Sequence, residues 1–208
     1  MTKIILIFLS IGFCSCGQKK TTHAIEPSAI KLNDSALQIA KSMDDSNHEK
    51  AILLLDKATK IDSNFYLAYW NKYVFQSELK QYEKAEQTLK NLIRIKPEDP
   101  QTYFVTGMFY ENTKDTISSE KYFQHAEILY INIFDTLHLS NKKYGNFCLN
   151  RAINLIMSGD TLKGNTFLKK SFNSETNKDY KEYIASFINK NKNQILKLFS
   201  NPNKNSQQ

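Results

Sequence analysis

The chain of 208 residues carries a formal net charge of +7 and is 41% hydrophobic and 24% charged, which excludes a wholly disordered chain and leaves ample length for one domain with a core. Only 6 glycines and 4 prolines are present, which disfavours all-β folds because these need frequent turns. Long segments carry Ala, Leu, Lys, Glu, Gln and Ile at helical spacing, so the composition predicts an all-α protein.

The first residues have the pattern of a targeting segment. Lys3 gives a positive start, an apolar run extends from Ile4 to Phe13, and polar residues follow from Gln18. The run is too short to span a bilayer, which needs about 20 apolar residues. It is typical of the apolar part of a secretory signal.

The apolar run ends in two cysteines, and the pair Ser15-Cys16 resembles the lipobox of bacterial lipoproteins. The resemblance implies that Cys16 is acylated and becomes the first mature residue, although Phe13 and Cys14 depart from the usual residues at their positions. Cleavage by the ordinary signal peptidase and an uncleaved anchor are the alternatives. Cys148 would then be the one remaining cysteine, expected to act as a small buried hydrophobe.

The remaining boundaries follow from composition. We expect a signal peptide at 1–15, a lipid-anchored linker at 16–33, a helical repeat domain at 34–199 and a disordered tail at 200–208. The stretch from Asn189 to the last residue contains four lysines and no acidic residue. A solvated basic tail is expected, with attraction to an anionic surface as the alternative, and the absence of interleaved aromatic residues argues against nucleic acid.

Residues 66–99 and 100–133 align with each other as two consecutive units of equal length, so that Tyr69 falls on Tyr103 and Leu89 on Phe123. This pattern resembles the tetratricopeptide repeat. The matching residues are Tyr69, Tyr82, Ala85, Leu89 and Pro97 in one unit and Gly107, Tyr110, Phe123 and Ala126 in the next. The resemblance implies an all-α, tetratricopeptide-like helical-hairpin solenoid of about four repeats plus a C-terminal capping helix.

The spacing has a physical reason. Ala85 is small where the second helix of the hairpin approaches the first, and Leu89 continues that face one turn later. Pro97 cannot continue a helix, and Asp99-Pro100 supplies a cap and a first helical residue for the next unit. Tyr73 departs from the family, which has a small residue there, so we expect it to push the helices apart or change the register.

Weaker units flank these two. Upstream, Ala51, Leu55 and Ala58 lie one period before the equivalent positions, Ser46 and Glu49 have the spacing of a capping box, and a first helix is expected at about Ser35–Asp44. Downstream, the equivalent positions are Ala152, Leu155, Gly164 and Leu168, and Asp160 is the predicted cap. An insertion is predicted at about 134–143, after a helix that runs through Phe134.

An amphipathic helix is predicted beyond Thr176, which forms a second candidate capping box with Asp179. Its apolar face comprises Tyr180, Tyr183, Ile184, Phe187 and Ile188, followed by Ile195 and Phe199. We expect this helix to cap the repeat stack. The alternative is a detachable helix that binds a membrane or a partner.

No enzyme signature is present in the sequence. The four histidines, at positions 23, 48, 125 and 138, lie far apart, so neither a metal nor a cofactor is expected. The stretch Gly159–Thr166 resembles a phosphate-binding loop, but Asn165 stands where its lysine would be. An unrecognised enzyme would need polar groups that converge only in the folded chain.

The resemblance places function on a surface, because tetratricopeptide solenoids bind peptides on the concave side formed by their first helices. The corresponding residues are Leu67, Trp70, Asn71, Val74, Phe104, Val105, Met108 and Glu111, with Leu149, Ile153 and Met157 in the fourth unit. The alternative is that these side chains, Trp70 among them, pack inside the stack. The family's carboxylate clamp is not predicted, because Asn71 alone of its residues is present.

The combined prediction is a lipid-anchored adaptor or scaffold of the bacterial cell envelope, at the outer membrane and facing the periplasm. It would bind a protein or peptide partner and no nucleic acid or metal. The alternative is a noncatalytic structural subunit of an outer-membrane assembly or secretion complex.

Overall fold

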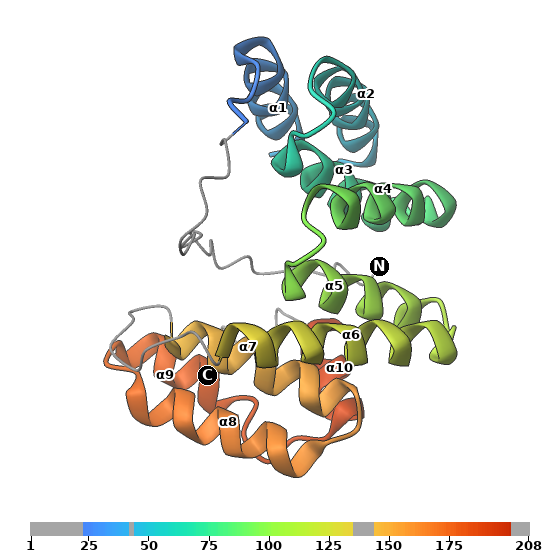
Figure 1. Cartoon of the computed structure of the whole chain (residues 1–208). Coiled ribbons are helices and arrows are strands. Elements are labelled where there is room, and N and C mark those ends of the chain that lie inside the picture. Colours follow the sequence, from blue (N-terminus) through green and yellow to red (C-terminus); the bar gives the residue numbers. More distant parts are fainter. Residues whose placement is uncertain (1–22, 42–43, 135–143, 201–208) are drawn as a thin grey trace. The chain divides into compact units, whose positions relative to one another are not determined.

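The computed structural model describes residues 23–41, 44–134 and 144–200, and within these ranges all regular secondary structure is helical (Figure 1). The helices are α1 (Pro27–Ala40), α2 (Asp45–Ile61), α3 (Tyr66–Glu78), α4 (Tyr82–Ile95), α5 (Pro100–Asn112), α6 (Thr116–Phe134), α7 (Tyr144–Met157), α8 (Thr161–Ser174), α9 (Lys178–Ala185) and α10 (Lys192–Ser200). The predicted all-α class is confirmed.

The chain divides into two compact units between Glu98 and Asp99. In the first unit α1 packs on α2, α2 on α3 and α3 on α4. In the second unit α5 packs on α6, α6 on α7, α7 on α8 and α8 on α9. Each unit is therefore a row of consecutive helices, and α1–α2, α3–α4, α5–α6 and α7–α8 are the four predicted hairpins.

The turn inside three of the hairpins has one residue in the left-handed region. These residues are Lys80 (φ 57°), Lys114 (φ 66°) and Gly159 (φ 101°). The N–H group that follows each of them donates back to a carbonyl near the helix end: Gln81 to Gln76, Asp115 to Tyr110 and Asp160 to Leu155. This pairing satisfies carbonyls that the helix end leaves open. Lys80 and Lys114 occupy equivalent positions in the two aligned repeats, so the sequence period is also a period of backbone conformation.

Two predicted helix starts are confirmed. The Asp99 carboxylate accepts a hydrogen bond from the Gln101 N–H at 3.2 Å, and Pro100 occupies the first turn of α5. The Asp160 carboxylate accepts from the Lys163 N–H at 3.1 Å at the start of α8. Both caps satisfy N–H groups that have no partner within their helix.

The capping box predicted at Ser46 and Glu49 is wrong. Asp44 is the cap of α2, and its carboxylate accepts from the Ser46 N–H at 2.8 Å. Because Ser46 therefore lies inside the first turn of the helix, its own hydroxyl cannot cap that helix. Asp44, two residues before Ser46, is the better cap because its negative carboxylate is also stabilised by the positive end of the helix dipole.

The first helix begins earlier than its predicted start at Ser35. It begins at Pro27, whose fixed φ suits the first helical position, and it buries Ala29, Ala36 and Ala40. Residues 27–33 of the predicted linker are therefore helical. These small residues let α1 lie close to α2. A pattern of large apolar residues does not reveal this contact, because alanines form it.

The predicted C-terminal helix is two helices, because the chain turns between α9 and α10 at Asn189, which has a φ of 62°. The cap of α9 is Asn177, whose side chain accepts from the Tyr180 N–H at 2.9 Å, so the capping box predicted from Thr176 and Asp179 is wrong. Asparagine tolerates the left-handed conformation better than most residues, which permits the break at Asn189.

The insertion prediction is confirmed in one respect, since α6 extends through Phe134. The segment 135–143, the predicted signal peptide with Cys16, and the predicted tail from 201 onward lie outside the described residues. Cys148 lies in α7 and is fully buried, as expected for a small hydrophobe.

Residues before α1 are fixed to the first unit by a buried carboxylate. Asp62, in the α2–α3 loop, accepts hydrogen bonds from the N–H groups of Asn64 and Glu26, and its two oxygens lie 2.8 and 2.9 Å from His23 Nε2. Burial alone would raise the pKa of Asp62, but these bonds outweigh it and hold the pKa below its usual value. The carboxylate therefore joins His23 to the start of α3.

Candidate functional site

The predicted groove residues of the first unit lie on α3 and differ in accessibility. Leu67 is 50% exposed, Asn71 is half-buried and Val74 packs against the core of this unit. Asn71 donates a hydrogen bond of 2.8 Å to Asn33 Oδ1 on α1, so the first helices of the two hairpins are linked on this face. Leu67 and Asn71 are one turn apart and form the accessible part of the predicted surface.

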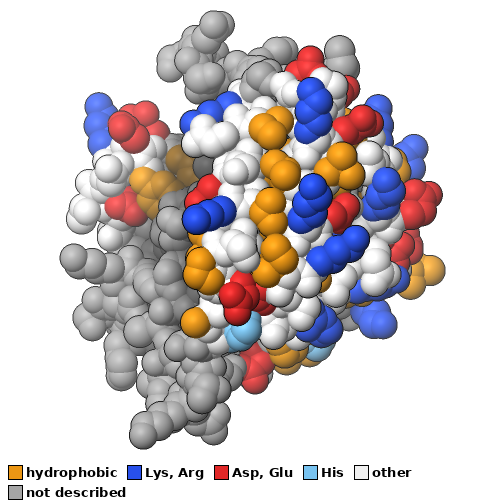
Figure 2. All heavy atoms as spheres, turned by 90° about the horizontal axis from the view of Figure 1, so that it is seen from above, with side chains coloured by type: hydrophobic (Ala, Val, Ile, Leu, Met, Phe, Trp, Pro, Cys, Tyr) orange, Lys and Arg blue, Asp and Glu red, His pale blue; other side chains and the backbone are white. Residues whose placement is uncertain are grey.

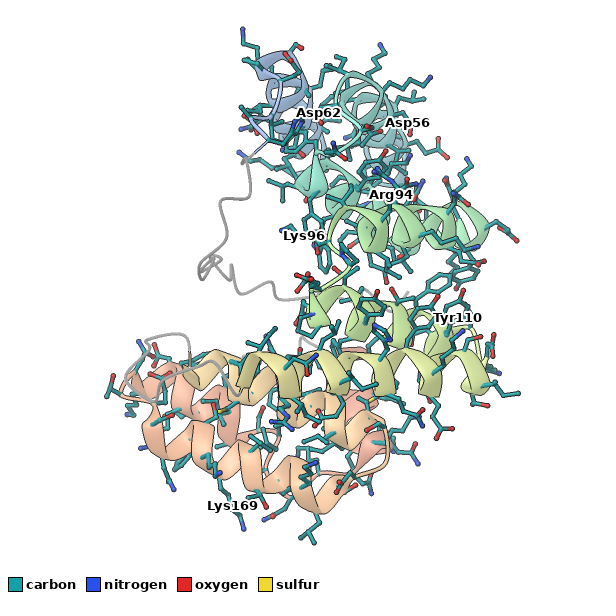
Figure 3. The ribbon with its side chains drawn as sticks, viewed as in Figure 1. Asp56, Asp62, Arg94, Lys96, Tyr110 and Lys169 are labelled. Carbon is teal, nitrogen blue, oxygen red and sulfur yellow. The ribbon has the colours of Figure 1, made fainter. Side chains whose placement is uncertain are left out.

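Trp70 lies in an aromatic cluster and is only 6% exposed. Its ring stacks on Tyr66 at 6.0 Å and meets Tyr73 at 6.3 Å. The Lys96 ammonium (labelled in Figure 3) lies 3.8 Å from the centre of the Tyr66 ring. Burial raises the pKa of Tyr73 to about 12. These contacts favour the packing alternative for Trp70, and its role in binding stays a prediction.

The predicted groove residues of the second unit are less accessible. Phe104, Val105 and Met108 on α5 are buried, and the Phe104 ring lies 5.8 Å from the Phe123 ring on α6. The positions predicted in the fourth hairpin are also buried: Leu149, Ile153 and Met157. All six are therefore largely inaccessible, and their role in binding a partner stays a prediction.

Glu111, the last predicted groove residue, is held by other parts of its own unit. Glu111 Oε2 accepts a hydrogen bond from the Ser119 hydroxyl at 2.7 Å and forms an ion pair of 2.7 Å with Lys192 of α10. Glu111 and Lys192 lie far apart along the chain, and the sequence contains no signal that pairs them.

A cavity that sequence reasoning missed lies on α2, α3 and α4. It has a volume of about 430 Å³, and its buried wall includes Gln76 and Thr88, whose side chains share a hydrogen bond of 2.7 Å. An ion pair of 2.6 Å between Lys72 and Asp56 lies at the cavity, which also includes the exposed Leu53 (Asp56 in Figure 3). The polar pairs satisfy one another, which argues for a solvated groove rather than a reaction centre.

The first hairpin presents several exposed apolar side chains. Ile30 and Leu37 on α1 and Ile61 on α2 are each more than a third exposed. Figure 2 looks onto the molecule from above α1 and α2, and hydrophobic side chains form a row there between lysines. A terminal repeat of a stack usually has a polar outer face, so this edge is unusually apolar.

Side chains that could ligate a metal form pairs rather than larger clusters among the described residues. No set of three or more His, Cys, Asp and Glu residues could hold a metal ion among the described side chains. His48 is buried, with Nδ1 3.2 Å from Glu78 Oε2 and its ring stacked on Phe75 at 4.9 Å. No helix within the described ranges is long and apolar enough to cross a membrane.

Residues 68–99, which comprise nearly all of α3 and α4, match the family described as Tetratricopeptide repeat. This segment is similar to a tetratricopeptide repeat. A comparison with curated proteins found no significant sequence match. The matched tetratricopeptide unit contains Asn71, and its accessible neighbour Leu67 directly precedes the matched residues.

Solved structures with a similar fold include PilW, described as a widely conserved type IV pilus biogenesis factor, with a TM-score of 0.51 at 19% identity over 72% of this chain and 63% of PilW. MamA from Desulfovibrio magneticus RS-1 has a TM-score of 0.46 at 16% identity, over 70% of this chain and 75% of that structure. At these identities the likeness to PilW bears on fold alone. It confirms the predicted tetratricopeptide-like arrangement of helical hairpins.

Proposed function

We propose that this tetratricopeptide protein is a lipid-anchored protein–protein interaction module of the bacterial cell envelope, acting as an adaptor or scaffold. The observation that carries the proposal is the tetratricopeptide unit at 68–99, with Leu67 half-exposed and Asn71 beside it on the first helix. An accessible leucine next to an amide can offer both apolar area and a hydrogen bond to a peptide backbone. The likeness to PilW supports the tetratricopeptide-like fold on which the proposal rests.

The anchor in this proposal is an acyl group on Cys16, at the outer membrane and facing the periplasm. The support is the charged start, the short apolar run and the pair Ser15-Cys16. Mass spectrometry of the amino-terminal peptide should find Cys16 as the first residue with acyl chains, and Cys16→Ser should release the protein from membranes. An unmodified peptide that begins before Cys16 would contradict the anchor and leave the interaction module untouched.

The interaction surface is tested by crosslinking in the native cell. A photo-crosslinking amino acid at Leu67 should capture a defined protein, and the same amino acid at Lys90, which lies exposed on α4, should not. Leu67→Asp should remove the interaction and leave the helical content unchanged, because Leu67 is half-exposed. Equal capture from both positions would argue against a binding surface on α3.

The same experiment separates the adaptor from its alternative, a noncatalytic subunit of an outer-membrane assembly. An adaptor should be recovered both free and bound, and the purified chain should be soluble and monomeric. A permanent subunit should be recovered only in complex, with the Leu67 crosslink saturated in every growth condition.

A further inference from the structure

The C-terminal helix α10 contacts the second unit through a few side chains. At its start the Asn189 N–H donates to Asn165 Oδ1 of α8, and near its end the Phe199 ring lies 6.0 Å from Phe187. The α10 backbone lies less closely against any one helix than the backbones of α1 to α9 do, among the described residues. Segments with few close neighbours open at lower free-energy cost than the rest of a domain.

The α10 helix is nevertheless well defined in sequence. The Asn191 side chain accepts from the Gln194 N–H at 3.0 Å, and the Gln194 side chain accepts from the Asn191 N–H at 2.9 Å. This reciprocal pair is a capping box, which starts a helix by local bonds alone. At only two and a half turns the helix is too short to be stable in isolation, so its persistence depends on its apolar face.

One face of α10 carries the contacts with the second unit. Lys192 forms the ion pair with Glu111, Ile195 is fully buried less than a turn later, and Phe199 follows one turn after Ile195. Asn193 and Lys197 are exposed on the other side. The docking pattern is therefore a basic residue followed by apolar residues three and seven positions later.

The surface beneath Lys192, here called the α10 seat, comprises Glu111 on α5 and Phe123 on α6. Phe104, Met108 and Glu111 are spaced by four and three positions, so they share one face of α5. The Lys192 ammonium lies 2.7 Å from the Glu111 carboxylate and 5.9 Å from the centre of the Phe123 ring. Glu111 is a predicted peptide-binding position and shares its face of α5 with two others, so Lys192 of α10 contacts the surface where a partner is expected.

We propose that the α10 seat is a binding site for an amphipathic helix of a partner protein, and that α10 occupies this site until the partner helix displaces it. The proposal rests on the proposed interaction function and names the chemistry of the partner. The partner helix carries Lys or Arg opposite Glu111 and apolar side chains three and seven positions later. Because α10 competes for the same surface, the apparent affinity for the partner is reduced by the fraction of the chain in which α10 is docked.

The test uses a fluorescein-labelled peptide of residues 189–200 and the full chain. Ile195→Asp in the full chain should undock α10, because it places a charge at a fully buried position, and it should tighten peptide binding by about tenfold or more relative to the unmodified chain. Glu111→Gln added to Ile195→Asp should weaken binding by about tenfold, since it removes the partner of Lys192. A peptide with Lys192→Glu should bind as weakly, whereas one with Asn193→Asp should bind normally.

The result that overturns the proposal is equal affinity of the peptide for the unmodified and Ile195→Asp chains, or no binding to either. If the Ile195→Asp chain fails to keep its helical circular dichroism, Lys192→Glu in the full chain replaces it, because Lys192 is partly exposed. A dimer of the unmodified chain in light scattering, lost on Ile195→Asp, would mean that the seat takes α10 of a second copy, which also overturns the proposal. The Leu67 crosslink lies in the first unit, so its outcome is independent of these results.

Discussion

The second and third hairpins carry side chains of different size at two equivalent positions. In α3–α4 the crossing point has the large Tyr73 and, one period before Phe123, the medium-sized Leu89. In α5–α6 the equivalent pair is Gly107 and the large Phe123. Tyr73, Leu89 and Phe123 are all buried. The comparison teaches that the position which the family fills with a small residue accepts a large buried one in the second hairpin, whereas the third hairpin keeps a glycine there beside the large Phe123.

The geometry at Gly107 shows that the third hairpin has no room for a side chain at this position. A Cβ atom there would lie 2.6 Å from Phe123 Cε1, which is closer than carbon atoms can pack. Gly164 in the fourth hairpin has the same limit, since a Cβ would lie 2.5 Å from Ile156 Cγ1 and 2.7 Å from the Ala152 carbonyl oxygen. The expectation that Tyr73 pushes the helices apart or changes their register stays a prediction, while the left-handed Lys80 and Lys114 show that the turns of the two hairpins keep the repeat period.

The largest expected effect is that of removing the bulky side chain of the second hairpin. Tyr73→Ala should lower the free energy of unfolding by about 3–5 kcal/mol, because it leaves a cavity that α4 cannot fill. Urea unfolding followed by circular dichroism measures this. Tyr82→Ala in the same hairpin is the control, and it should cost less than about 1 kcal/mol since Tyr82 is 43% exposed. Similar costs for both variants would mean that Tyr73 does not fill the crossing.

The next largest effect is expected from adding a single carbon atom at Gly107 in the third hairpin. Gly107→Ala should cost about 1–3 kcal/mol through its clash with Phe123, although alanine is intrinsically the better helix former. The double variant Gly107→Ala, Phe123→Leu recreates the smaller partner of the second hairpin. It should be more stable than the sum of the two single effects predicts, by about 0.5–3 kcal/mol. Simple additivity would show that the two positions do not share their volume.

A smaller effect is expected at the turns that the hairpins have in common. Lys114→Gly should raise the free energy of unfolding by about 0.5–1 kcal/mol, because glycine adopts a φ of 66° without the steric cost that a Cβ brings. Lys80→Gly should give a similar gain, and Lys114→Ala should give none. Thermal unfolding of the three variants measures these changes in stability. A loss on Lys114→Gly would mean that the lysine side chain stabilises the turn by more than its backbone costs.

The smallest effect concerns an exposed pair that the two hairpins hold in equivalent places. On α4 Lys90 pairs with Glu86 at 2.7 Å, and on α6 Gln124 donates to Glu120 at 3.1 Å. Lys90→Ala should cost no more than about 0.5 kcal/mol, and about 1 M NaCl should reduce this further. Gln124→Ala should cost a similar amount with less dependence on salt. A large effect of either would contradict the assignment of these faces to solvent.

Sequence patterns identified the hairpins because their determinants are local. The caps at Asp99 and Asp160 act within one turn, and the small residue Gly107 recurs with the repeat pattern of neighbouring helices, so these features could be recognised directly in the sequence. The early start of α1 was missed because its contacts with α2 use alanines, which carry little hydrophobic signal. The break at Asn189 was missed because apolar residues continue at helical spacing across the turn.

The candidate site was less predictable for a different reason. The periodic frame predicts which residues lie on the first-helix face, and Phe104, Met108 and Glu111 are spaced so that they share one face of α5. It cannot indicate what covers that face. The ion pair of Glu111 with Lys192 depends on how the chain returns after α8, and neither residue differs in its sequence environment from an exposed charged residue.

The hydrogen bonds between His23 and Asp62 determine how far the first unit could move from a membrane. If Cys16 carries the proposed lipid, only residues 17–22 separate the acylated cysteine from His23 and the buried carboxylate that holds it. Even a fully extended chain of this length reaches about 25 Å at most. The module would then sample a thin layer next to the lipid headgroups rather than a wide hemisphere, which raises its effective concentration for partners held in the same membrane.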